Sequence, residues 1–441
     1  MNDPSPLPAS ATPAHVRLRT ADLPGLHGHI RAELEDFVVE EMPLYEPSGE
    51  GEHVHFLLEK HGISTFESLL WISKAVQVSE HRIGYAGLKD AKAVTRQWMS
   101  VHRVAPSRLL SIRHPRIRVL AAVRHPTRLR IGHLRGNRFT IRIRGARVEH
   151  LAAAREALGR LVTTGVPNAY GVQRFGVKQD GHILGRAIVH GDFQEFLRHL
   201  CGLPDPREGD PRVRGAREAF DAGDVREAFA RFPMKHRIQK KALSVLLRGG
   251  EPRAAYEALG KRPRRIYVSA YQSWLFNRVL DRRLADGTVD RLLEGDLAWQ
   301  HATGALYAVT DAGEEAARAT RFDASPTGPL PGYEGRHPTG APRAIEDEVL
   351  SAERLDDDLF RAAHVRTRGA RRPLRVPLAE GSLEAEGGED VVVRFVLPPG
   401  AFATVVLAEL MKNHAPEAPE EEVEAEPEAE ETGEVAPGED G

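Results

Sequence analysis

The sequence predicts an α+β protein in which a mixed or largely antiparallel sheet is interrupted by a helix-rich insertion. Segments of period two crowd the first 150 residues, and helical patterns fill the middle of the chain. A strand-like segment then returns near the end. A β segment that returns after a helical middle is typical of one domain inserted into another.

The first hundred residues alternate between apolar and polar residues in several places. This alternation predicts four strands, at 36–41, 53–60, 82–88 and 93–101. Between the second and third strands, "STFESLLWISKAVQV" (64–78) predicts a helix with Ser64 or Thr65 as its N-cap. Lys89 and Asp90, in "GYAGLKDAKAVTRQW", therefore lie in a loop between two strands.

Residues 101–147 contain thirteen arginines and no Asp or Glu. In "RFTIRIRG" (138–145) the apolar side chains face one way, and Arg138, Arg142 and Arg144 face the other. Such a cationic face suits a phosphate backbone, because guanidinium groups bind phosphate oxygens and displace counterions. The alternative is a solvated strand face balanced by acids elsewhere. Nucleic-acid binding is the favoured interpretation.

The rest of the chain is predicted to be helical, then irregular, then β followed by a helix. Amphipathic patterns predict helices at 149–165 and within 269–284. The Gly- and Pro-rich residues 311–344 indicate an extended loop or linker. "EDVVVRFVLPPG" (389–400) predicts a strand and "AFATVVLAELM" (401–411) a helix.

Composition divides the chain into a basic body and an acidic tail. The net charge is −2, but residues 415–441 hold twelve acids and no Lys or Arg, which leaves 61 bases against 51 acids in the remainder. The tail has too few apolar residues to offset its ordering entropy, so we expect it to be disordered. It is either a solubilising appendage or a competitor of nucleic acid for the basic surface.

Other features of the sequence exclude some classes of protein. The single cysteine, Cys201, excludes a zinc finger and an internal disulfide and fits a reducing compartment. No apolar run approaches membrane-spanning length and no secretory signal is evident, so we expect a cytoplasmic protein. The oligomeric state is undetermined, with a monomer expected.

Several standard catalytic motifs are absent from the sequence. It has no Walker phosphate loop, no G-x-G-x-x-G opening a helix and no G-x-S-x-G elbow, so a nucleotide cofactor is not expected. His53 and His55 lie on the same face of a predicted strand, with Glu52 nearby, and are candidate metal ligands. The spacing does not fix a third ligand. We expect no metal and no cofactor.

The residues alone leave Asp90 open to two interpretations. An acid in a Lys-Asp turn most often accepts a backbone N–H as a cap or turn former. A catalytic carboxylate would instead need a pocket, a nearby cation and an aromatic ring to pack the substrate. Spacing does not decide between them.

Five motifs together resemble the tRNA pseudouridine synthase D (TruD) family. They are "IRAELEDFVVEE", "GYAGLKDAKAVTRQW", "VPNAYGVQRFG", "RIYVSAYQSWLFN" and "VRFVLPPGAFATVVLAELM". The similarity covers about Gly28 to Met411. The resemblance implies a pseudouridine-synthase catalytic domain interrupted by an inserted TRUD domain. The expected parts are a flexible lead-in (1–27), the catalytic domain (28–194 and 345–414), the inserted domain (195–344) and the disordered tail (415–441).

The resemblance also implies an activity: isomerisation of uridine, usually uridine 13 of tRNA, to pseudouridine without a cofactor. Asp90 falls on the family's catalytic aspartate, a nucleophile that adds to the base or acts at the ribose. The family's basic residue near that acid falls on Arg31. A target uridine in a stem must flip out of the stack. The arginine-rich segment is the candidate for binding the RNA backbone while this happens.

Further site residues follow from the same resemblance. Tyr170 would stack on the flipped uracil, while Asn168 either pairs with the base edge or shapes a Pro-Asn turn. Phe37 would help wall the pocket or is a core aromatic. The remaining motif residues are expected to bind RNA or support the site: Lys89, Thr95, Gln97, Gln173, Arg174 and Phe175.

Two other function classes stay open from the sequence. A non-catalytic RNA-binding protein that kept the basic sheet would bind RNA without forming product. A metal-dependent hydrolase centred on His53 and His55 would lose its activity with a chelator.

Overall fold

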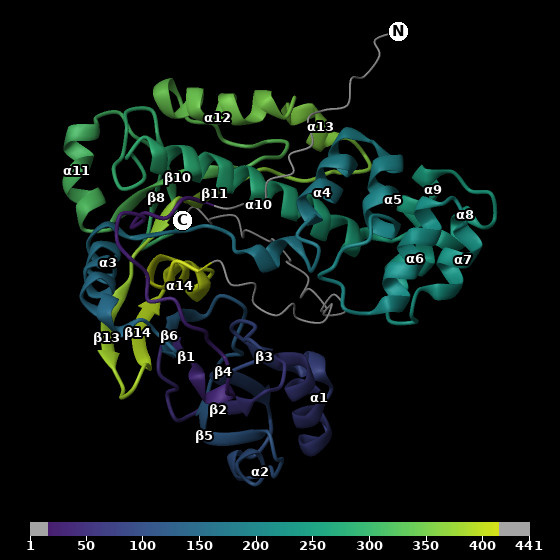
Figure 1. Ribbon diagram of the computed structural model, residues 1–441. Coiled ribbons are helices and arrows are strands. Elements are labelled where there is room, and N and C mark those ends of the chain that lie inside the picture. The colour runs from purple at the N-terminus through teal and green to yellow at the C-terminus, as the bar shows by residue number, and fades with distance from the viewer. Residues whose placement is uncertain (1–15, 414–441) are drawn as a thin grey trace, which may run out of the picture.

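The structure, a computed structural model, describes residues 16–413. Figure 1 shows a large sheet in the lower left, a group of helices on the right, and the long helix α10 running between them under α12. The predicted tail (415–441) and residues 1–15 of the predicted lead-in lie outside the described residues.

Strands and helices alternate early in the chain, and helices dominate its middle. The strands are β1 (Phe37–Pro43), β2 (His53–His61), β3 (Ile83–Tyr85), β4 (Val94–His102), β5 (Ile117–His125), β6 (Leu134–Ile143), β7 (Val166–Pro167), β8 (Leu297–Gln300), β9 (Leu306–Ala308), β10 (Ala324–Leu330), β11 (Ala370–Pro373), β12 (Arg375–Val376), β13 (Ala379–Ala385) and β14 (Val391–Leu397). The helices are α1 (Thr65–Val76), α2 (Pro106–Leu110), α3 (Leu151–Thr164), α4 (Gly181–His190), α5 (Phe193–Cys201), α6 (Pro211–Asp221), α7 (Val225–Arg231), α8 (Arg237–Leu246), α9 (Pro252–Ala258), α10 (Lys261–Ala285), α11 (Ala312–Thr320), α12 (Gly340–Ala352), α13 (Asp357–Arg361) and α14 (Ala403–Met411).

The large sheet has eight strands in the order β13-β14-β6-β1-β4-β2-β5, with β3 also paired to β4. Only β1 and β4 pair in parallel, so the prediction of a largely antiparallel sheet is confirmed for the described residues. One edge of β4 faces β2, while β1 and β3 share the other edge. The loop that contains Asp90 connects the end of β3 to the start of β4, where β4 pairs with β1.

The returning β segment completes this sheet. β14 pairs with β6 over seven residues, and α14 then packs on the same core as β1. Leu26 donates its N–H to the Leu410 carbonyl at 2.9 Å, and Thr20 donates its hydroxyl to the Glu409 carboxylate at 2.6 Å. The described part of the predicted lead-in, residues 16–27, thus contacts the last turn of α14.

The helices α4–α9 pack around the first half of α10 in one apolar core. α4 crosses α10 at Gly185, where an added Cβ would lie 2.0 Å from the Tyr267 carbonyl oxygen, so only glycine allows this approach. The predicted edges of the insertion, Glu195 and Ala344, lie inside α5 and α12.

The prediction of an extended loop or linker over 311–344 is wrong. Residues 324–330 form β10, a buried strand of a four-stranded sheet in the order β11-β10-β8-β9, and α11 precedes it. The prolines are tolerated because β8 pairs only with residues 324–326 and β11 only with 327–330. Gly328 lets the Phe276 ring of α10 pack closely on this strand.

A buried ion pair joins β11 to α12. The Arg371 guanidinium donates to both carboxylate oxygens of Glu346, at 2.7 and 2.9 Å, and each side chain is 2% exposed. Burial raises the pKa of Glu346 above its usual value, while Arg371 opposes that shift. Removal of one partner from a buried ion pair leaves the other charge uncompensated and destabilises the folded protein.

We expect Arg371→Met to lower the free energy of unfolding by about 3–5 kcal/mol, because it leaves the Glu346 carboxylate buried without its cation. Arg138→Met removes an exposed pair with Glu380 and should cost no more than about 1 kcal/mol. Urea unfolding of both variants measures the difference. Equal losses would contradict this account.

Candidate active site

Lys60 fixes the backbone of the loop that carries Asp90. Its side chain points from β2 into the interior, and its Nζ donates to the carbonyls of Ile63 at 2.8 Å, Lys89 at 3.2 Å and Asp90 at 3.0 Å. The residue is completely buried. Because its charge is solvated by carbonyls of the loop itself, the loop has one strongly preferred path.

Lys89 and Asp90, adjacent in sequence, point in different directions. Lys89 forms a 2.6 Å ion pair with Glu41 of β1, and the two side chains are 4% and 1% exposed. Burial raises the pKa of Glu41, opposed by the Lys89 charge and by the Trp98 N–H. The Asp90 side chain, in contrast, is 42% exposed. Lys89 is thus an anchor for the loop, whereas the Asp90 carboxylate is accessible.

A chain of hydrogen bonds holds the first part of the same loop, at Gly87 and Lys89. The Lys89 N–H donates to the Thr65 hydroxyl at 3.1 Å, and this hydroxyl donates to Gln97 Oε1 at 3.2 Å. Gln97 Nε2 in turn donates to the Gly87 carbonyl at 3.3 Å. Thr95 is buried on β4. These contacts fit Gln97 and Lys89 as supports of the loop.

Arg31 lies beside the Asp90 carboxylate. Its Nη2 donates to Asp90 Oδ2 at 2.8 Å, and its guanidinium lies 4.1 Å from the centre of the buried Phe37 ring. The backbone of Arg31 is left-handed, with φ of 61°, a conformation that is uncommon for residues other than glycine. Phe37 is 1% exposed, so it supports Arg31 from the core.

Arg144, which directly follows β6, holds the start of β1 near Arg31. Its guanidinium forms two 2.8 Å hydrogen bonds with the carboxylate of Asp36, which is fully buried just before β1. Burial disfavours the charged form of Asp36, yet Arg144 and the Glu33 N–H hold its pKa below the usual value. In this structure Arg144 therefore braces the start of β1.

The other two predicted cationic positions on β6 also have acidic partners. Arg138 donates to Glu380 at 2.9 Å and Arg142 to Glu386 at 2.6 Å, both at exposed positions. The predicted alternation of β6 is confirmed, because Phe139, Ile141 and Ile143 are buried. A phosphate at these positions would have to displace a carboxylate.

A second cluster forms around Tyr170. The Arg372 guanidinium lies 4.4 Å from the Tyr170 ring centre, and Phe276 and Phe402 lie 5.7 and 6.1 Å from it. Asn277 of α10 holds the Tyr170 backbone through two 2.9 Å hydrogen bonds. Phe402 is 40% exposed, so the cluster has an accessible aromatic face.

Asn168 and Arg174 hold this cluster in place through hydrogen bonds and a ring contact. Asn168 accepts from Arg372 at 2.5 Å and donates to the Pro373 carbonyl at 2.9 Å, so both ends of its side-chain amide bond within the protein. Arg174 lies 5.7 Å from the Tyr170 ring and donates to Ser273 at 3.1 Å and to Ser269. Burial lowers the pKa of both Arg372 and Arg174 below the ordinary value.

Of the rest of the Gln-Arg-Phe motif, Gln173 lies in the short 3-10 helix Val172–Phe175, and Phe175 is buried in the core of the helices. Sequence reasoning missed Lys60, Glu41, Arg372 and Phe402. Lys60 was detectable, because it occupies an inward position of an alternating strand, in phase with Phe56 and Leu58. Arg372 is one of two adjacent arginines and had no such pattern.

The two ends of α14 contact segments that lead to the two clusters. Asn413, just after α14, donates to the Gly28 carbonyl at 2.7 Å, three residues before Arg31. At the other end Phe402 contacts Tyr170, and Thr404 lies against Gly171. α14 therefore contacts both the segment that precedes Arg31 and the segment that carries Tyr170.

The predicted histidine pair forms ring contacts with other histidines. The His53 ring lies 4.8 Å from that of His102, and the His55 ring lies 4.4 Å from that of His125. His55 Nε2 is 2.9 Å from the Thr127 carbonyl oxygen. Between residues 16 and 413 no three His, Cys, Asp or Glu side chains are arranged to hold a metal ion, and no helix is long and apolar enough to cross a membrane.

Comparison with known proteins places the chain among the pseudouridine synthases. A family model described as tRNA pseudouridine synthase D (TruD) matches residues 14–410, so the chain belongs to this family. This finding confirms the resemblance seen in the sequence.

Individual relatives agree with that family. The chain is 44% identical to tRNA pseudouridine synthase D of Geobacter sulfurreducens, over 90% of this chain and 97% of the relative. It is 40% identical to that of Thermus thermophilus, over 91% and 94%. A crystal structure assigned as tRNA pseudouridine synthase D from Methanosarcina mazei superposes with a TM-score of 0.78 at 30% identity, covering 91% of this chain and 97% of that one. The α+β fold class is thereby confirmed.

We expect Lys60→Met to lower kcat on the order of 10²-fold with little change in tRNA affinity, because a loosened loop misplaces Asp90 by about 1 Å or more. Lys74→Met, at an exposed position of α1, is the matched control and should behave as wild type. Single-turnover kinetics and filter binding measure the two quantities. An unchanged kcat for Lys60→Met would contradict the role given to this lysine.

Proposed function

We propose that this protein isomerises uridine 13 of tRNA to pseudouridine, with Asp90 as the nucleophile. The observation that carries the proposal is the placement of Asp90: a half-exposed carboxylate on a loop anchored by buried Lys60 and Lys89, with Arg31 at 2.8 Å. Membership of the tRNA pseudouridine synthase D family supports it. A cap or turn role would not require this degree of anchoring.

The reaction needs few groups because it is balanced within one nucleotide. The bond from ribose C1′ to uracil N1 breaks, the base rotates, and C1′ bonds to C5, whose proton is lost while N1 gains one. No water is consumed, so the second carboxylate of a glycoside hydrolase is unnecessary. In this proposal Asp90 attacks either the base or the ribose, and Arg31 orients its carboxylate.

The ring cluster supplies a surface for the flipped base. Tyr170 and Phe402 offer aromatic faces on which an extruded uracil stacks. Arg372 lies over the Tyr170 ring and stiffens it through a cation–π contact. In this proposal Asn168 acts through Arg372 rather than on the base.

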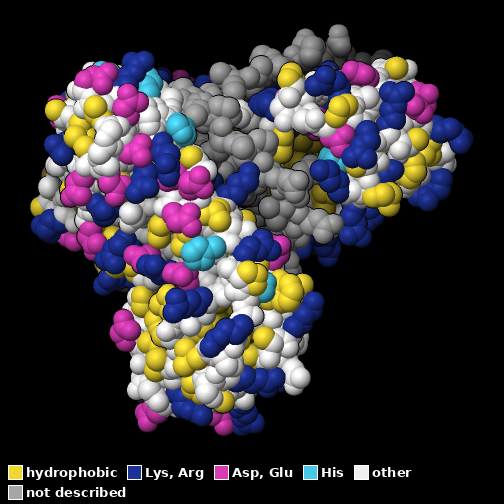
Figure 2. Space-filling view, turned by 60° about the horizontal axis from the view of Figure 1, so that its bottom comes forward, with side chains coloured by type: hydrophobic (Ala, Val, Ile, Leu, Met, Phe, Trp, Pro, Cys, Tyr) yellow, Lys and Arg dark blue, Asp and Glu magenta, His cyan; other side chains and the backbone are white. Residues whose placement is uncertain are grey.

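The arginine-rich segment is proposed to hold the tRNA backbone. Figure 2 shows dark-blue Lys and Arg side chains spread over the lower lobe of the molecule, mixed with hydrophobic ones. Arg118, Arg130 and Arg135 are exposed, and no acid between residues 16 and 413 lies within ion-pair distance of them. These positions, rather than Arg138 or Arg142, are the ones open to phosphate. Cytoplasmic localisation and a monomeric state stay predictions.

The catalytic proposal is tested with Asp90→Asn and tRNA labelled with tritium at C5 of uridine. We expect the variant to bind tRNA as wild type does and to release less than one thousandth of the tritium at equal times, because an amide is a poor nucleophile. Wild-type release in the presence of a chelator should be unchanged. Full activity of the variant refutes the role of Asp90.

The competing class, a non-catalytic RNA-binding protein, is judged in the same assay. It predicts stoichiometric binding and no tritium release from the wild-type chain. A metal-dependent hydrolase would likewise release no tritium from C5, and its hydrolytic activity would vanish with a chelator.

The proposed backbone contacts are tested by salt dependence. Arg135→Ala should reduce the slope of log affinity against log salt concentration by about 0.7–0.9, the value for one phosphate contact. Arg138→Ala, whose guanidinium is paired with Glu380, should change it by much less. Identical slopes for both variants would contradict the assignment.

A further inference from the structure

The acidic tail, residues 415–441, has no role in the function proposed above. It contains twelve Asp and Glu residues and no Lys or Arg. It also lies beyond residue 410, where the match to the family model ends, so the fold that the family shares does not explain it. Acidic segments at the end of a chain are often interaction tails, and their natural partner is a basic surface. This chain itself offers such a surface.

The tail leaves the described fold beside the candidate site. Asn413, the last described residue, donates its side-chain N–H to the Gly28 carbonyl at 2.7 Å. Gly28 precedes Arg31 by three residues, and Arg31 forms the 2.8 Å ion pair with Asp90. Fully extended, residues 415–441 would span about 90 Å, whereas β6, the longest strand of the large sheet, is about 34 Å long. The tail is therefore long enough to reach cations anywhere on this sheet.

Three cations near the Asp90 loop are exposed and have no acidic partner. They are Lys92, Arg130 and Arg135, which we call the site cations. No Asp or Glu between residues 16 and 413 lies within ion-pair distance of any of them. Arg138, in contrast, is paired with Glu380. The site cations are therefore open to an anion from outside the described part of the chain.

Packing brings the site cations to the Asp90 loop. Lys92 follows Asp90 by two residues and is part of that loop. Leu129 and Leu134, each followed directly by one of the two arginines, pack with Ala86 in one small apolar core. Ala86 directly follows β3, on the way to Asp90. The site cations and the start of the tail therefore both border this loop.

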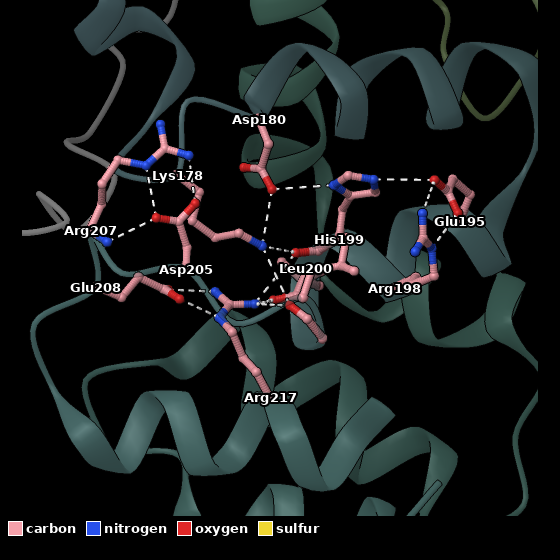
Figure 3. Close-up of polar contacts among 12 residues, drawn as sticks. Lys178, Asp180, Glu195, Arg198, His199, Leu200, Asp205, Arg207, Glu208 and Arg217 are labelled. Carbon is pink, nitrogen blue, oxygen red and sulfur yellow. Dashed lines mark hydrogen bonds and ion pairs between the residues drawn. The ribbon is translucent and has the colours of Figure 1, made fainter. Parts of the chain in front are cut away.

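The polar network in the group of helices is different, because its charges are already matched. Figure 3 shows Lys178 beside Asp180, and Arg217 forked onto Glu208. Lys178 Nζ also donates to the His199 carbonyl at 2.9 Å. Since these two cations already face two anions, they have no charge to spare for the tail.

We propose that the acidic tail binds the site cations and competes there with the phosphate backbone of RNA. Carboxylate and phosphate oxygens both accept from guanidinium and ammonium groups, so one occupant excludes the other. Because the tail is attached beside the site, its effective concentration there is on the order of millimolar. An RNA whose phosphates meet all the site cations displaces the tail more readily than one that meets few of them. The proposal rests on the proposed function for its RNA ligand.

The first test replaces every Glu of the tail by Gln, and Asp440 by Asn, in the full-length protein. We expect this neutral-tail variant to bind tRNA about fivefold more tightly than wild type at about 50 mM salt, because the competitor is removed. The gain should fall below about twofold at about 200 mM, because salt screens the tail contacts. A tail of the same composition in shuffled order is the matched control and should behave as wild type. Equal affinities of the wild-type and neutral-tail proteins at low salt would overturn the proposal.

The gain must also depend on the site cations. When Lys92, Arg130 and Arg135 are all changed to Ala, neutralising the tail should alter tRNA affinity by less than about twofold. Changing Lys235 and Lys241, which are exposed on α8 or just before it, to Ala should leave the fivefold gain in place. A gain that persists without the site cations would overturn the proposal, because it would show repulsion of RNA by the overall charge of the tail.

Direct contact is measured by carbodiimide cross-linking, which joins a lysine to a carboxylate. We expect a cross-link between Lys92 and the tail within one molecule, and we expect bound tRNA to abolish it. Cross-links from the tail only to Lys235 or Lys241, or only between two molecules, would overturn the proposal.

The outcomes separate this proposal from the proposed function. Absence of pseudouridine with both the wild-type and the neutral-tail protein refutes the function itself. Product formation together with equal tRNA affinity of the two proteins refutes only the contact between the tail and the site cations.

Discussion

The burial of one ammonium group determines the geometry of the candidate site. Lys60 is completely buried, and carbonyls of the Asp90 loop itself solvate its charge. Releasing those carbonyls would leave a buried cation without compensation, so the loop and the strand are fixed together. The Lys89–Glu41 pair adds a second buried anchor one residue before Asp90. With its neighbours held inside, the Asp90 side chain is directed outward, beside Arg31.

Segments that are far apart in the sequence meet at the candidate site. The Asp90 loop comes from the first hundred residues, and the Tyr170 cluster depends on Arg372 and Phe402 near the end of the described chain. Closure of the large sheet by β14 against β6 brings the end of the chain to its beginning. The helices between them hold Tyr170 through Asn277 of α10. These helices therefore help to shape the ring cluster.

Sequence reasoning predicted what local periodicity encodes and missed what only tertiary packing decides. The early strands, the helix at 64–78 and the final strand and helix were confirmed because alternation and capping are local. The linker prediction over 311–344 failed because β10 tolerates its prolines by changing partners along its length. The placement of Asp90 beside Arg31 came from resemblance, whereas the burial of Lys89 opposite Glu41 required the fold. The acidic partners of Arg138 and Arg142 lie more than 240 residues away, which no local pattern reveals.

The central claim is that the Asp90 carboxylate faces the bond between ribose and uracil of an extruded uridine. The most direct measurement is a crystal structure of the Asp90→Asn protein with a tRNA substrate. The account predicts that the side chain at position 90 lies within about 3.5 Å of ribose C1′ or uracil C6 of one flipped uridine. A bound uridine whose sugar and base both lie far from this side chain would contradict the account.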